Sequence, residues 1–116
     1  MNTAYIYQEN IHNLEAPREL IPLLFDFVRP ASVLDVGCGT GTWLRIFAET
    51  GVQDILGVEG SHVMNEKLEV PSSQIKIHDL RQPLKLNRKF DLVMIFLMND
   101  PVIDVKTNGI AVNSFL

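Results

Sequence analysis

The sequence is short of cysteine, of long apolar runs and of positive charge. Its single cysteine cannot form an intrachain disulfide, which is typical of proteins from a reducing compartment. The longest apolar run spans residues 92–98, whereas a membrane-spanning helix needs about 20 apolar residues. The first residues have neither the basic start nor the apolar core of a signal peptide. We therefore expect a cytoplasmic protein without a membrane-bound part.

The charge balance argues against a nucleic-acid partner. The chain has 10 Lys and Arg residues against 14 Asp and Glu residues, a net charge of −4 at pH 7. Proteins that bind nucleic acid normally carry a basic patch or stripe. The 47% hydrophobic content is that of a globular protein, and 116 residues are enough for one domain. We expect a single domain over residues 1–116, with an N-terminal arm at residues 1–15 and an atypical tail at residues 99–116.

The apolar pattern alternates between helical and extended periodicity, which predicts a parallel α/β sheet. Helices are predicted at residues 17–28, 42–50 and 61–69, and strands at residues 32–36, 54–58, 74–78 and 90–98. Residues 81–89 are interpreted as a polar connection. Near the C-terminus, Asn108-Gly109 between two short apolar segments predicts a two-residue hairpin.

The chemical information is concentrated in VLDVGCGTGTWL at residues 33–44. An apolar strand there runs directly into a glycine at every second position, and a helix follows. Glycine permits a sharp turn and lets a ligand approach the main chain, and such a strand end is the usual ligand crevice of an open α/β sheet. The dinucleotide fingerprint G-x-G-x-x-G/A is not completed, because Thr42 occupies its last position. Asp35, two residues before the first glycine, favours a positively charged nucleoside.

In this segment the sequence resembles the class I S-adenosylmethionine-dependent methyltransferases, whose first motif it matches almost letter for letter. Glu59 ends the strand in ILGVEG, where this family places an acid on the two ribose hydroxyls. Asp79 and Leu80 end the strand in IKIHDL, where a side chain and a backbone amide meet the adenine amino group. With FDLV at residues 90–93, four motifs follow in order, and the resemblance covers residues 12–93. The segment that begins at His12 is similar to a bacterial small-molecule branch of the family.

The resemblance implies a Rossmann-like class I methyltransferase fold. This is a three-layer α/β sandwich with a mostly parallel sheet in the order 3-2-1-4, to which the hairpin would be added at the edge. It also implies S-adenosyl-L-methionine as the cofactor and methyl transfer to a small-molecule acceptor. The implied cofactor-binding residues are Asp35, Gly37, Cys38, Gly39, Gly41, Glu59, Gly60, Asp79 and Leu80. No catalytic residue is assigned, and no metal site is expected because the histidines lack the spacing of metal ligands.

After residue 93 the sequence departs from the family pattern. A substrate-facing segment, a fifth strand and an antiparallel pair usually follow, whereas this sequence reads MIFLMNDP at residues 94–101 and ends 15 residues later. We therefore expect a domain truncated after its fourth strand. The alternative function is a non-catalytic cofactor-binding module without a substrate pocket. An uncovered apolar fourth strand could also pair two copies as a homodimer.

Overall fold

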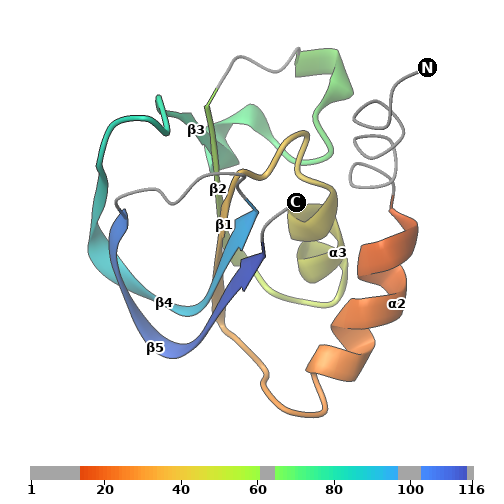
Figure 1. Cartoon of the computed structure of the whole chain (residues 1–116). Helices are drawn as coiled ribbons and strands as arrows, with labels where there is room; N and C mark the ends of the chain where they lie inside the picture. The colour runs from red at the N-terminus through yellow and green to blue at the C-terminus, as the bar shows by residue number, and fades with distance from the viewer. Residues whose placement is uncertain (1–13, 61–64, 97–102, 115–116) are drawn as a thin grey trace.

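The computed structural model describes residues 14–60, 65–96 and 103–114. Its elements are α2 (Glu15–Leu24), β1 (Ser32–Val36), α3 (Thr42–Glu49), β2 (Asp54–Glu59), η1 (Asn65–Lys67), η2 (Ser72–Gln74), β3 (Ile75–Ile77), β4 (Leu84–Phe96) and β5 (Ile103–Ser114). Five strands form one sheet in the order β3-β2-β1-β4-β5, and α2 and α3 lie together on one side of it (Figure 1). The predicted order 3-2-1-4 is confirmed, with β5 added at the edge.

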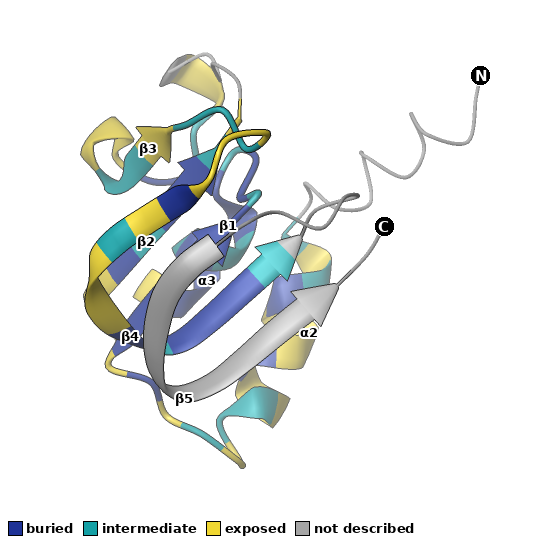
Figure 2. Ribbon diagram, turned by 60° about the vertical axis from the view of Figure 1, so that its left-hand side comes forward, coloured by how far each residue is buried: buried dark blue, intermediate teal, exposed yellow. Residues whose placement is uncertain are grey.

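The sheet is parallel throughout, since all four strand pairings are parallel, and β1 is its central strand. It pairs with β2 on one side, from Ser32↔Asp54 onwards, and with β4 on the other. Every residue of β1 is buried, and Figure 2 shows the adjoining part of β4 buried as well. The chain moves outward from β1 to β3 and then returns to the opposite side of β1. The carboxyl ends of these strands therefore meet where α/β sheets bind ligands.

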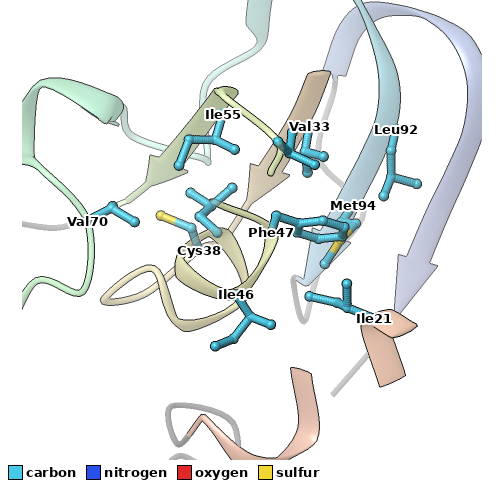
Figure 3. Close-up of a cluster of buried hydrophobic side chains, with 11 residues drawn as sticks. Ile21, Val33, Cys38, Ile46, Phe47, Ile55, Val70, Leu92 and Met94 are labelled. Carbon is cyan, nitrogen blue, oxygen red and sulfur yellow. The ribbon is translucent and has the colours of Figure 1, made fainter. Parts of the chain in front are cut away.

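Alternation along the strands gives the sheet two apolar faces. The face under the helices is filled by Val33 of β1, Ile21 of α2 and Phe47 of α3, with Leu92 and Met94 of β4 (Figure 3). All five side chains are nearly or fully buried. Burying side chains of this size contributes about 1.5–3 kcal/mol each, so this cluster holds the two helices against the sheet.

On the opposite face of the sheet, side chains of the strands pack against one another rather than against the helices. Leu34, Val36 and Val58 pack there against Leu84 and Phe90. The last two come from the first half of β4, which starts six residues before the predicted strand. The expected polar connection at residues 81–89 is therefore partly wrong, and the signal that was missed is the alternation of residues 84–86. Of the three layers expected, the described residues supply the sheet and one helical layer.

The expected C-terminal hairpin is not formed. Asn108 and Gly109 lie inside β5, which runs parallel to β4 as a single strand. Between the pairs Phe90↔Thr107 and Leu92↔Ile110 the register shifts by one residue, so a β-bulge accommodates the two residues that suggested a turn. β5 pairs with the side of β4 that the sequence left uncovered, and β5 is the edge strand on that side of the sheet.

Two helices also differ from their predicted ranges. α2 ends at Leu24 rather than near residue 28, and the predicted helix at residues 61–69 contributes only the short η1 to the described chain. The N-terminal arm lies outside the described residues apart from its last two positions, as does the beginning of the tail. No helix in the described part of the chain is long and apolar enough to cross a membrane.

Candidate functional site

The turn between β1 and α3 depends on its glycines. Gly37, Gly39 and Gly41 have φ angles of 83°, 60° and 90°, a region that residues with a side chain rarely adopt. The turn is folded back on β2, because the N–H groups of Gly37 and Cys38 donate to the Val58 carbonyl at 2.7 and 3.2 Å. The Gly41 N–H donates to the Cys38 carbonyl at 3.0 Å. The predicted sharp turn is therefore present, and α3 begins immediately after it.

The amide groups of this turn limit what it can bind. The N–H groups of Gly37, Cys38, Gly39 and Gly41 all donate to acceptors within the protein. Recognition of a pyrophosphate at such a turn relies on main-chain N–H groups that point at the ligand. These four N–H groups are therefore not directed at a ligand, which agrees with the incomplete dinucleotide fingerprint.

Cys38 faces the interior rather than the strand ends. Its side chain lies in the cluster under the helices (Figure 3). A Cβ built on Gly57 would be 2.6 Å from the Cys38 Sγ and 2.8 Å from the Leu44 Cδ1. Burial raises the pKa of the thiol, and the nearby carboxyls of Asp35 and Glu59 raise it further. Because only the thiolate is a good nucleophile, Cys38 is a packing residue.

Glu59 connects the end of β2 to the glycine turn. Its Oε2 accepts a hydrogen bond from the Gly39 N–H at 2.7 Å, and its Oε1 accepts one from the Gly60 N–H at 2.7 Å. An ionised carboxylate has about four acceptor positions, two on each oxygen. Each oxygen of Glu59 therefore keeps one position for a ligand. The sequence placed Glu59 at the strand end but did not show this contact.

Asp35 is the least satisfied polar side chain of the site. It is 1% exposed, and neither carboxyl oxygen has a hydrogen-bond partner among the described residues. Burial raises its pKa to about 8, with a further contribution from the negative charge of Glu59. Leaving a buried polar group unpaired is costly and uncommon. A cationic or N–H-bearing ligand at this position would remove that cost.

The end of β3 lies beside the end of β2. The His78 N–H donates to the Glu59 carbonyl at 2.9 Å, and a Cβ built on Gly60 would be 3.6 Å from the Leu80 Cδ1. Next to them, the Asp79 carboxylate accepts three hydrogen bonds from Arg81, all at 3.0 Å. These bonds hold the pKa of Asp79 below its usual value. The sequence reasoning overlooked Arg81, although its position two residues after Asp79 was a usable signal.

The connection between β2 and β3 also contacts the glycine turn. The Glu69 N–H donates to the Thr40 carbonyl at 2.8 Å, and the Arg45 guanidinium of α3 forms an ion pair with the Glu69 carboxylate. A Cβ on Gly41 would be only 3.0 Å from the Val70 Cγ2. The structure thus brings together the predicted residues of three strand ends. Among the residues that it describes, no group of three metal-ligating side chains is present.

Comparisons with known proteins agree with this architecture. The sequence profile of the methyltransferase domain family matches residues 7–106. Among solved structures, the plantazolicin methyltransferase BpumL, in complex with a monoazolic desmethylPZN analog and SAH, is similar in fold. Its TM-score is 0.53 at 21% sequence identity, over 82% of this chain and 39% of that chain. No curated protein matches the sequence.

Proposed function

Because the chain belongs to the methyltransferase domain family, we propose that it binds S-adenosyl-L-methionine at the carboxyl ends of β1, β2 and β3. The observation that carries the proposal is the buried carboxyl of Asp35 beside the glycine turn, which has no hydrogen-bond partner in the described part of the chain. S-adenosylmethionine supplies an ammonium group and a methyl group on a positively charged sulfur. The plantazolicin methyltransferase, which has a similar fold, was solved with SAH, the demethylated product of this cofactor.

Asp35 and the glycine turn would hold the methionine end of the cofactor. A positive group beside Asp35 favours the ionised carboxylate, since an opposite charge offsets part of the desolvation cost. Gly37, Gly39 and Gly41 expose the main chain without a side chain in the way. Cys38 enters this site only through its backbone, because its thiol is directed into the core.

Glu59 suits the ribose of the same ligand. Its two oxygens are each held by one main-chain N–H, from Gly39 and Gly60, and each keeps one acceptor position. Two adjacent acceptors match the two neighbouring hydroxyls of a ribose, and hydrogen bonds to a charged group are stronger than neutral ones. Asp79 and Leu80, next to Gly60, would then contact the adenine.

For the reaction itself, we propose methyl transfer to a small-molecule acceptor. The residues of this chain would contribute by binding and aligning the reactants, since correct placement alone can supply about 7–11 kcal/mol of the barrier. No side chain is assigned as a catalytic acid or base. The net charge of −4 supports a small-molecule partner rather than a nucleic acid, and the buried Cys38 thiol suits a reducing cytoplasm.

A second candidate is a cofactor-binding module without turnover. It is favoured by one observation, that the chain spans 39% of the length of the plantazolicin methyltransferase. Contacts between an enzyme and its substrate accelerate a reaction only where they are stronger in the transition state than in the ground state. We therefore expect cofactor binding with little methyl transfer by this chain alone. If copies associate, the free edge of β5 is the surface that we propose for a homodimer.

Isothermal titration calorimetry of the purified chain tests the proposal. S-adenosylmethionine and S-adenosylhomocysteine should both release or absorb binding heat, whereas NAD should not, because four main-chain N–H groups of the turn already donate within the protein. Absence of binding by the first two ligands to a chain with intact circular dichroism would contradict the proposal. Robust transfer of a methyl group to a small acceptor would instead exclude the non-catalytic alternative.

A further inference from the structure

The Asp79 carboxylate at the end of β3 is largely occupied by Arg81. The main-chain N–H and the Nε of Arg81 both donate to Oδ1, and its terminal NH2 group donates to Oδ2, each at 3.0 Å. Of the roughly four acceptor positions of an ionised carboxylate, three are used. The position that remains is on Oδ2. Asp79 therefore differs from Glu59, which keeps one free position on each oxygen.

The ion pair between Arg81 and Asp79 is exposed to solvent. The Arg81 side chain is 88% exposed and the Asp79 side chain 44%. Exposed ion pairs usually contribute little to the free energy of unfolding. Both side chains lie next to Leu80, which faces Gly60 at the neighbouring strand end. The three hydrogen bonds from Arg81, called the fork below, therefore orient the Asp79 carboxylate and are expected to add little to stability.

We propose that Arg81 is a positioning residue that restricts Asp79 to one acceptor and thereby selects a nucleobase with an exocyclic amine. This inference rests on the proposed function. One N–H of an amino group satisfies the remaining position on Oδ2. A base without that amine leaves this position to solvent and so loses one hydrogen bond to a charged group. Without the fork, Asp79 can rotate and its discrimination falls.

The experiment compares two ligands and three variants of the full chain. The ligands are S-adenosylhomocysteine and its analogue in which hydrogen replaces the 6-amino group of the base. The wild type should prefer the amine by about tenfold or more, as expected for one hydrogen bond to a charged group. Arg81→Ala should lower this preference about threefold or more, with the affinity for the analogue unchanged. Arg81→Lys should also lower it, because lysine keeps the charge but cannot form the fork.

Arg88→Ala is the matched control, since Arg88 forms a similar fork with Asp54 at the start of β2. It should leave the ratio of the two affinities unchanged. An unchanged or increased ratio in folded Arg81→Ala overturns the inference, and full rescue by Arg81→Lys overturns the role of the fork. If the folded wild type binds neither ligand, the proposed function itself fails and the inference fails with it.

Discussion

The Glu59 carboxylate and the Gly39 N–H, twenty residues apart in the sequence, form a 2.7 Å hydrogen bond between the end of β2 and the glycine turn. This contact gives the strand-end acid two roles. It connects β2 to the turn, and in the proposed site the remaining acceptor positions of the carboxylate bind the ligand. A substitution at Glu59 therefore affects both the site and the turn.

We expect Glu59→Ala to weaken binding of S-adenosylhomocysteine by about 1–3 kcal/mol, the range for losing hydrogen bonds to a charged group. The same variant should accelerate hydrogen exchange of the Gly39 amide, which loses its acceptor. Calorimetry and amide exchange measure the two effects separately. Unchanged affinity would remove Glu59 from the site. Unchanged exchange at Gly39 would show that the turn keeps its conformation without the Glu59 carboxylate.

The stability of the free chain should depend on pH through Asp35. Its pKa is about 8 in the folded chain, against an ordinary value of 3.8, so between these values the folded chain binds more protons than the unfolded one. The free energy of unfolding should therefore fall as the pH rises from about 4 to about 8, by up to about 1.4 kcal/mol per pH unit. Urea unfolding at several pH values measures this slope. Asp35→Asn should reduce it, and the same slope in both proteins would contradict the assignment.

Ligand binding should depend on pH in the opposite direction. An ammonium group beside Asp35 favours the ionised carboxylate, so binding below pH 8 should release a proton. The affinity for S-adenosylhomocysteine should then increase between pH 5.5 and 7.5, by up to about tenfold per unit. Calorimetry in buffers with different ionisation enthalpies would detect the released proton. Asp35→Asn serves as the control, and proton release that persists in this variant would assign the titrating group elsewhere.

Gly57 of β2 is expected to be intolerant of substitution. A Cβ there would be 2.6 Å from the Cys38 Sγ and 2.8 Å from the Leu44 Cδ1, and overpacking of a core costs about 1–3 kcal/mol. Gly57→Ala should lower the free energy of unfolding by this amount in a denaturant titration. Combining it with Cys38→Ala, which removes the closest atom, should cost less than the sum of the two single changes. Additive costs would show that the thiol does not restrict this position.

Deletion of residues 103–116 should increase self-association. β5 pairs with β4 from Leu84 to Phe96, with two register shifts, and residues 92–96 of β4 are all apolar. An uncovered apolar edge is a template for pairing with another chain. Light scattering of the shortened chain, compared with a chain lacking only residues 115–116, tests this expectation. A shortened chain that stays monomeric at high concentration would mean that β5 is not needed to protect β4.

Local pattern in the sequence determined the main elements and predicted the position of the candidate site. A short apolar strand, three glycines at alternate positions and an apolar helix can be recognised without the structure, because turn conformation and amphipathic periodicity are local properties. Acids at strand ends could be placed for the same reason, since the carboxyl ends of parallel strands meet at one edge. The order of β1 to β4 followed from these features and the family resemblance.

Only the tertiary structure decided what each of these residues contacts. The bond between Glu59 and Gly39, the isolation of Asp35 and the packing of Cys38 against Gly57 all depend on how distant segments are placed against one another. Asn108-Gly109 shows most clearly where prediction from the local sequence failed. The dipeptide favours a hairpin locally, but the segments on both sides of it pair with β4 instead, and a bulge accommodates the two residues.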